Sequence, residues 1–160
     1  MITQDRLKEV LSYDPDAGTF AWIVTRRGLK SGSAAGGARP DGYVRICVDG
    51  KLYYAHRLAF LFMEGKWPDD IIDHANGNPS DNRWVNLRAA TQTQNLGNTA
   101  KRKSRGYKGA YFQKEKMKWR AVIQIDRKQR SLGLFDSELE AHAAYCEAAA
   151  HYFGKFARAA

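Results

Sequence analysis

The segment Lys101-Arg102-Lys103-Ser104-Arg105-Gly106 constrains the fold more than any other part of the chain. Four of its six residues are basic and none has an apolar side chain. Such a segment stays in water rather than entering a hydrophobic core, so it predicts an exposed linker at 101–105. A length of 160 residues suits either one domain or two small modules. The linker favours two modules, which we place at 1–100 and 106–160.

Nearly all of the excess positive charge lies in and just after this linker. Residues 101–130 contain twelve Lys or Arg and two acidic residues, whereas the rest of the chain has 14 basic and 15 acidic residues. Charge concentrated in this way is typical of a protein that binds a polyanion, because each neutralised phosphate releases condensed counterions. A basic surface that serves only solubility is the alternative.

Several classes of protein are excluded by composition. No apolar run reaches the roughly 18 to 20 residues of a membrane-spanning helix, and the polar start lacks the pattern of a signal peptide. We therefore expect a cytoplasmic protein that does not bind membranes. The two cysteines, Cys47 and Cys146, are too far apart in sequence to form a CxxC zinc motif, so no structural zinc is expected.

The first module is predicted to mix helices and strands. Amphipathic spacing predicts a helix over 3–11 with Thr3 as its N-cap, and a strand follows at 19–25. The glycine-rich stretch 28–42 is expected to be a loop. Two strands, at 43–48 and 51–55, flank the turn residues Asp49-Gly50, and a helix over 56–63 follows, with His56 packing at its start.

The middle of the chain combines an Asp-His pair with a polar loop. Asp73-His74 follow the apolar step Ile71-Ile72, and the next residues up to Asn82 are mostly Asp, Asn, Gly and Ser. We predict a second strand at 84–88 and a helix over 92–99, which begins with the capping-box spacing of Thr91 and Gln94. Strand, strand and helix would bring residues that are distant in sequence close together.

The residues of this hairpin suit the hydrolysis of a phosphodiester. The reaction needs a deprotonated water and a cation beside the leaving oxygen, where negative charge develops. Histidine can act as the base near neutral pH, and an Asp with an amide oxygen suits a hard cation such as Mg²⁺.

The motif formed by His74, Asn86 and Asn95 resembles the HNH nuclease family in its His-Asn-Asn variant. The resemblance implies an α+β fold whose core at about 69–99 is the ββα-metal, or His-Me finger, motif, preceded by a small α/β region. It implies that His74 is the general base, that Asn86 holds the loop together, and that Asp73 and Asn95 bind Mg²⁺ or another divalent cation such as Mn²⁺. The flanking sequence is similar to that of free-standing phage and intron-encoded endonucleases, and Arg83 or Arg88 would bind a phosphate.

The second module is predicted to be a three-stranded antiparallel sheet packed on one helix. We place its strands at 109–113, 118–125 and 130–135, and its helix at 137–152 with Ser137 and Glu140 at capping-box spacing. Alternation along the second strand directs one set of residues to the helix and leaves Arg120, Val122 and Gln124 on the other face. Small residues, Ala141, Ala144 and Ala148, would allow the helix to lie close to the sheet.

Residues 106–157 resemble the Apetala-two/ethylene-response-factor DNA-binding domain. The likeness includes Gly106-Tyr107-Lys108-Gly109, Lys118-Trp119-Arg120-Ala121 and Leu132-Gly133-Leu134-Phe135. It implies that the sheet enters the major groove of double-stranded DNA. The residues expected to contact bases or backbone are Lys108, Tyr111, Gln113, Arg120 and Gln124, with Arg127 and Arg130 on phosphates.

These observations favour a metal-dependent DNA endonuclease of the homing or phage type, positioned on duplex DNA by its C-terminal sheet. A DNA-binding regulator with a catalytically inactive nuclease region is the alternative. An RNA-directed nuclease is a weaker alternative, since a sheet suits the wide major groove of B-form DNA better than the narrow one of RNA. No heptad stretch or additional dimerisation helix is evident, which favours a monomer that nicks one strand. Pairing through the hairpin at Asp49-Gly50 is the alternative.

Overall fold

The computed structural model describes residues 1–25, 28–99 and 106–158. The chain forms two compact units, Met1–Ala89 and Ala90–Ala160. The predicted linker at 101–105 lies outside the described residues. The division between the units lies before this segment, so the helix predicted at 92–99 belongs to the second unit rather than the first.

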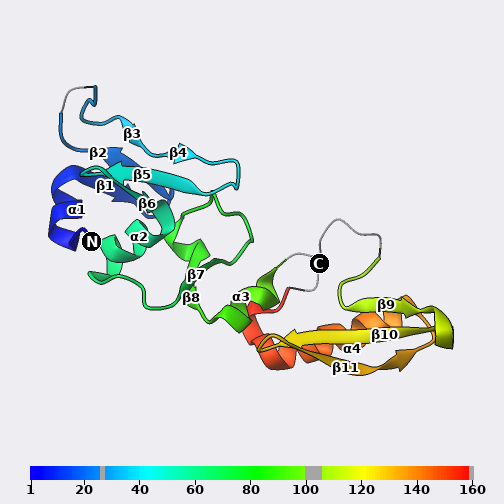
Figure 1. Cartoon of the computed structure of the whole chain (residues 1–160). Coiled ribbons are helices and arrows are strands. Elements are labelled where there is room, and N and C mark those ends of the chain that lie inside the picture. Colours follow the sequence, from blue (N-terminus) through cyan, green and yellow to red (C-terminus); the bar gives the residue numbers. More distant parts are fainter. Residues whose placement is uncertain (26–27, 100–105, 159–160) are drawn as a thin grey trace. The chain divides into compact units, whose positions relative to one another are not determined.

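The first unit combines two helices with short antiparallel sheets (Figure 1). Its strands form three sheets, ordered β1-β2-β3, β4-β5-β6 and β7-β8. The elements are α1 (Gln4–Val10), β1 (Leu11–Asp14), β2 (Thr19–Trp22), β3 (Ala34–Ala35), β4 (Gly37–Ala38), β5 (Val44–Val48), β6 (Lys51–Tyr54), α2 (Ala55–Glu64), β7 (Ile71–His74), η1 (Trp84–Asn86) and β8 (Leu87–Ala90).

Local sequence signals explain several of these elements. The Thr3 side chain caps α1 by accepting a hydrogen bond from the backbone N–H of Arg6. Asp49 and Gly50 have φ of 49° and 78°, which joins β5 to β6 in a tight hairpin. Helix α2 ends at Gly65, as predicted from the sequence.

One hydrophobic core holds the first unit together. Helices α1 and α2 pack their apolar faces against strands of the first unit. The largest of the fully buried side chains there are Leu7, Val10, Leu11, Ile46, Val48, Leu58 and Leu61. This core fixes the strands and the helix from which the site described below is built.

Three details differ from the predictions. Leu11–Asp14 is a strand rather than the end of a helix and a break, and β2 stops at Trp22. The predicted loop at 28–42 contains the short strands β3 and β4. Residues Trp84–Asn86 form a 3-10 turn, and the strand begins only at Leu87. The turn forms because the Asn86 side chain donates back to the Asp81 carbonyl, which bends the chain before β8.

The second unit contains the three-stranded antiparallel sheet and the helix that the sequence predicted. Strand β10 lies between β9 and β11, and α4 lies along one face of the sheet (Figure 1). The elements are α3 (Gln92–Asn98), β9 (Ala110–Gln113), η2 (Lys114–Lys116), β10 (Lys118–Ile125), β11 (Lys128–Phe135), α4 (Glu138–Phe153) and η3 (Gly154–Phe156). Both predicted capping boxes are present, at Thr91 and Gln94 and at Ser137 and Glu140.

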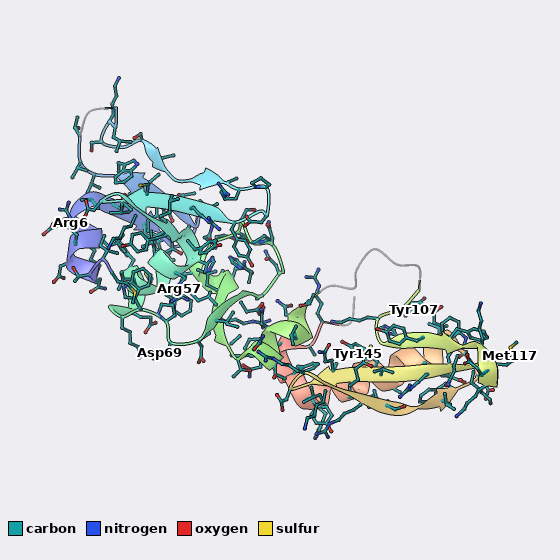
Figure 2. All side chains as sticks on the ribbon, in the orientation of Figure 1. Arg6, Arg57, Asp69, Tyr107, Met117 and Tyr145 are labelled. Atoms are coloured by element: carbon teal, nitrogen blue, oxygen red, sulfur yellow. The ribbon has the colours of Figure 1, made fainter. Side chains whose placement is uncertain are left out.

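The buried face of α4 differs from the predicted one. Ala141 is buried as expected, but Ala144 and Ala148 lie only at the edge of the core. The buried stripe runs at i, i+4, i+8 and i+12 through Ala141, Tyr145, Ala149 and Phe153. Tyr145, labelled in Figure 2, packs with Ile123 and Ile125 of β10, and a Cβ on Gly109 would lie 2.2 Å from its ring, so the absence of a side chain there leaves room for it.

Helix α3 is packed into the second unit by contacts far along the chain. A Cβ atom on Gly97 would lie 2.6 Å from Cγ of Phe153, so the end of α4 is in direct contact with the α3 backbone. The Lys108 ammonium donates to the carbonyls of Gly97 and Thr99 at 3.0 and 2.7 Å. Thr93 donates to Asp126 in the β10–β11 turn at 2.6 Å. These contacts explain why the second unit begins at Ala90.

Among the described residues, no helix is long and apolar enough to cross a membrane.

Candidate functional site

The Asp73-His74 pair ends strand β7 and is buried. Asp73 is 4% exposed and His74 is 5% exposed. The backbone N–H of Ala75 donates to the carbonyl of Asn86 at 2.9 Å, which continues the pairing of β7 with β8. The hairpin therefore holds both side chains at a defined position beneath the polar loop.

The loop after His74 is closed by Asn86. The Asn86 amide donates to the Asp81 carbonyl at 2.8 Å, and its oxygen accepts from the Asn76 N–H at 2.9 Å. Asn76 in turn donates to the Asp81 carboxylate at 2.7 Å. Asn86 is 6% exposed, so its own two bonds to the loop are partly shielded from water.

The surroundings of His74 in this loop favour its neutral form. Its Nε2 lies 3.5 Å from Oδ1 of Asn82, which is itself buried. Burial lowers the pKa of His74, while the neighbouring Asn82, Asp73 and Asp81 oppose that shift. A neutral imidazole near pH 7 is able to accept a proton from water.

The turn between β1 and β2 packs against the loop. The Tyr13 hydroxyl donates to the carbonyl of Asn82 at 2.7 Å, and the Trp84 N–H donates to the Pro15 carbonyl at 2.9 Å. Gly18 has φ of 71°, and a Cβ there would lie 2.3 Å from the backbone nitrogen of Arg83. No side chain fits between this turn and the loop, so Gly18 is required for the close approach.

Two arginines of the site form ion pairs. Arg88 donates from Nε to Oδ2 of Asp73 at 2.7 Å, and its guanidinium forms an ion pair with the same carboxylate. Arg83 binds Asp81 through both carboxylate oxygens, at 2.8 and 2.6 Å. The hydrogen bond from Arg83 is the main cause that lowers the pKa of Asp81 to about 2. Both arginines were expected to bind phosphate, and Arg88 lies on the carboxylate that was expected to bind metal.

Four further residues, which the motif did not indicate, belong to a group of ring contacts that includes His74. The rings of His56 and His74 meet edge to face with centroids 5.2 Å apart. Tyr54 stacks on His56 at 5.4 Å, and Tyr43 contacts both histidines. Arg45 lies over the Tyr54 ring, 4.4 Å from its centroid. We refer to Tyr43, Arg45, Tyr54 and His56 as the Arg45 cluster.

His56 lies at the start of α2, as expected, but it is also part of the site. It is 8% exposed, and its Nδ1 has no hydrogen-bond partner among the described residues. Burial, followed by the neighbouring His74 and Arg57, lowers the pKa of His56 to about 3. The alternation of strands 43–48 and 51–55 was a signal that could have placed Arg45 and Tyr54 on one face, because they are direct partners in the β5–β6 register.

The second expected metal ligand lies in the other unit. Asn95 is half-buried on α3, which packs in the second unit, whereas Asp73 belongs to the first. Within residues 1–25, 28–99 and 106–158, no group of three or more His, Cys, Asp or Glu side chains is placed to hold a metal ion. The oxygen atoms of Asp73 and Asn95 are nevertheless the kind of ligands that Mg²⁺ prefers.

The free face of the second unit's sheet carries four of the residues expected to contact DNA. Tyr111 and Arg120 are direct cross-strand partners and both are exposed. Gln113 and Gln124 lie on the same face by alternation, and Arg120 is oriented by a 3.2 Å hydrogen bond to the Ser131 hydroxyl. The opposite face of β10 is buried through Ala121, Ile123 and Ile125, as predicted.

The other three expected DNA contacts have partners within the second unit. Lys108 donates to the Arg158 carbonyl at 2.8 Å as well as to Gly97 and Thr99, and burial lowers its pKa. All three of these hydrogen bonds are made within the second unit, and the expected contact of Lys108 with DNA stays a prediction. Arg127 donates to the Gln92 side chain at 3.0 Å, and Arg130 lies over the ring of Tyr152 on the helix side of the sheet.

Residues 53–96 match the family model described as HNH endonuclease. This match covers the end of β6, all of α2, the Asp73-His74 hairpin and most of α3. This part of the chain is therefore similar to HNH endonucleases.

Two curated phage proteins are similar to this chain. DNA endonuclease I-HmuI of Bacillus phage SP01 is 39% identical over 80 residues, which cover 46% of this chain and 46% of that protein. Protein 3.8 of Escherichia phage T7 is 37% identical over 62 residues, which cover 38% of this chain and 51% of that protein. The chain thus spans about half the length of the relatives it matches.

A solved structure that describes DNA binding and cleavage by the HNH homing endonuclease I-HmuI is also similar. The alignment covers 54% of this chain and 49% of that one, with a TM-score of 0.42 and 27% sequence identity.

Proposed function

We propose that this protein is a metal-dependent DNA endonuclease of the phage homing type, which hydrolyses one phosphodiester bond and is positioned on duplex DNA by its C-terminal sheet. The observation that carries the proposal is the buried Asp73-His74 pair at the end of β7, next to a loop closed by Asn86, within a segment that matches HNH endonucleases.

His74 is the proposed general base. Asn86 closes the loop, Asn82 lies against the imidazole, and burial favours the neutral ring. The neutral ring takes a proton from the attacking water, which makes that water a stronger nucleophile. In this proposal Asn86 acts by positioning rather than by touching the reacting atoms.

Asp73 and Asn95 are the proposed ligands of a divalent cation, most simply Mg²⁺. Both offer oxygen atoms to a hard ion, and Asp73 brings the negative charge. The bound ion would stabilise charge on the leaving oxygen. For Asp73 to serve in this way, its carboxylate must be shared with Arg88 or released by it.

The second unit is the proposed DNA-binding part. Residues 90–160 contain 14 basic and six acidic residues, a formal net charge of +8, whereas residues 1–89 contain 12 basic and 11 acidic ones. The free face of the sheet presents Tyr111, Gln113, Arg120 and Gln124, which are suited to contact DNA in the major groove. The likeness of residues 106–157 to the Apetala-two/ethylene-response-factor domain supports the same role.

A DNA-binding regulator with an inactive nuclease region is the second candidate. The observation that favours it is the ion pair between Arg88 and Asp73, since a carboxylate neutralised by arginine is a weaker ligand for a cation. The two candidates make opposite predictions for cleavage of DNA.

Cleavage of supercoiled plasmid distinguishes these candidates. We expect the full chain to convert supercoiled to open-circle DNA in Mg²⁺ or Mn²⁺, and we expect EDTA to stop the reaction. Open circles should accumulate before linear DNA, because a monomer with one Asp73-His74 centre acts on one phosphodiester at a time. Gel electrophoresis over a time course measures both forms. Direct conversion to linear DNA would instead indicate two coordinated centres, and intact plasmid in every cation would favour the regulator.

The DNA-binding role of the second unit is tested with two fragments. A fragment 90–160 should fold and bind a duplex, with affinity that falls steeply as salt rises. A fragment 101–160 lacks α3, which exposes Phe153 and removes two of the carbonyls that Lys108 binds, so it should melt at a lower temperature. Circular dichroism and fluorescence anisotropy measure these properties. Absence of duplex binding by the folded longer fragment at low salt would refute the role.

A further inference from the structure

We propose that Arg45 binds a backbone phosphate of the DNA strand on which His74 acts, and that Tyr54 holds its guanidinium next to the group of rings formed by Tyr43, His56 and His74. The inference rests on the proposed nuclease function and adds a substrate contact outside the His-Asn-Asn motif.

One side of the Arg45 guanidinium is fixed by Tyr54. The two residues are direct partners across β5 and β6, the guanidinium carbon lies 4.4 Å from the ring centroid, and the guanidinium donates to the Tyr54 hydroxyl. An arginine held over an aromatic ring has lost much of its rotational freedom before a ligand arrives. Less entropy is therefore lost when it binds an anion.

One donor of Arg45 lacks a partner among the described residues. Its Nε is buried and has no partner among the described residues. A buried donor without an acceptor is costly, so a rearrangement of the side chain that brings Nε to an acceptor is favoured. The side chain as a whole is 27% exposed, so part of it is open to solvent.

Asp41 is too weak a partner to satisfy Arg45. Its carboxylate lies 4.0 Å from the guanidinium, and the Asp41 side chain is 49% exposed. Ion pairs of this kind contribute little in water. A phosphate, with two oxygens for the fork of donors, would compete effectively with this pair.

A continuous group of rings connects Arg45 with the proposed base. Tyr43 lies 5.5 Å from Tyr54 and 6.0 Å from His74 between ring centroids. His56 fills the space between Tyr54 and His74, at 5.4 and 5.2 Å. The guanidinium and the His74 imidazole therefore border the same aromatic surface. A DNA strand whose scissile phosphate lies at His74 would bring a neighbouring phosphate to Arg45.

Arg57 provides a matched control in the same unit. It lies on α2 (Figure 2), donates to the Pro68 carbonyl at 3.2 Å and lies near the Trp67 ring rather than near His74. Arg57→Gln removes the same charge as Arg45→Gln and leaves the contacts of Arg45 with Tyr54 in place, although it also removes a charge that lowers the pKa of His56. Arg45→Lys keeps the charge but loses the planar fork of donors.

The salt dependence of binding reports whether Arg45 contacts a phosphate. The full-length protein would be titrated onto a fluorescein-labelled duplex in Ca²⁺ at several KCl concentrations, and anisotropy would give Kd. We expect the slope of log Kd against log salt to fall by about one for Arg45→Gln, because one phosphate contact is lost. The slope should be unchanged for Arg57→Gln and nearly restored in Arg45→Lys. A wild-type slope for Arg45→Gln, in protein with unaltered circular dichroism, would overturn the proposal.

The position of the contact is tested with duplexes that carry one neutral methylphosphonate near the mapped cleavage site. Substitution at the contacted phosphate should slow cleavage by the wild type by about tenfold or more, the effect of losing a charged hydrogen bond. The same substitution should have little further effect on Arg45→Gln. Equal interference in both proteins would place the contact elsewhere. Intact DNA with the wild type would instead count against the nuclease function, and the salt slopes would still decide whether Arg45 binds phosphate.

Discussion

Replacing His74 by alanine is expected to lower the rate of DNA cleavage by about 10²- to 10⁴-fold, the range that a positioned general base contributes. The expectation rests on a buried imidazole whose pKa is lowered and whose loop is closed by Asn86. DNA affinity should stay within a few-fold of the wild type, because His74 is 5% exposed and offers little surface to the nucleic acid. Single-turnover nicking rates and anisotropy measure the two effects separately.

Asp73→Asn is also expected to abolish cleavage, because the proposed cation ligand is lost.

The control for the His74 change is another histidine. His151 is exposed on α4 of the second unit. Among the described residues, Tyr152 is the only aromatic residue whose ring it contacts. His151→Ala should cleave DNA at the wild-type rate. Full activity of a folded His74→Ala protein would remove the proposed mechanism, whereas equal losses in both variants would point to a general effect on folding.

Replacing Arg88 by alanine is expected to reduce the free energy of unfolding by about 3 kcal/mol, because one partner of a buried ion pair is removed. The Asp73 carboxylate is 4% exposed, and Arg88 binds it at 2.7 Å with a side chain that is 19% exposed. Urea unfolding followed by circular dichroism would measure the loss. Because a cation that binds only the folded protein adds to its stability, Mg²⁺ should stabilise Arg88→Ala more than it stabilises the wild type.

Arg83 is the matched control for Arg88. It pairs with Asp81 at a similar distance, but its side chain is 49% exposed, so Arg83→Ala should cost less than about 1 kcal/mol. The double variant Asp73→Asn with Arg88→Gln should recover part of the stability that either single change loses, since no charge is then left unpaired. Additive losses in the double variant would show that the two side chains do not depend on each other.

The sequence by itself determined the features that depend on neighbouring residues. Hydrogen bonds over three positions define the helix starts at Thr91 and Ser137, and two residues with positive φ define the hairpin at Asp49-Gly50. Alternation along β10 identified its buried face. The spacing of His74 and Asn86 likewise located the loop between them. This loop is closed by hydrogen bonds of a single side chain, that of Asn86.

Only the tertiary structure decided which distant residues meet. Arg88 was expected to bind phosphate but pairs with Asp73, and Lys108 was expected to bind DNA but is held by backbone carbonyls. The Arg45 cluster depends on the register of β5 with β6 and on the packing of α2. Neither of these produces a repeating pattern in the sequence near His74. The assignment of α3 to the second unit depends on Phe153 packing against Gly97, 56 positions earlier in the chain. Contacts between distant residues depend on complementary shape and charge in the folded chain. The conformational propensity of each short segment does not determine them.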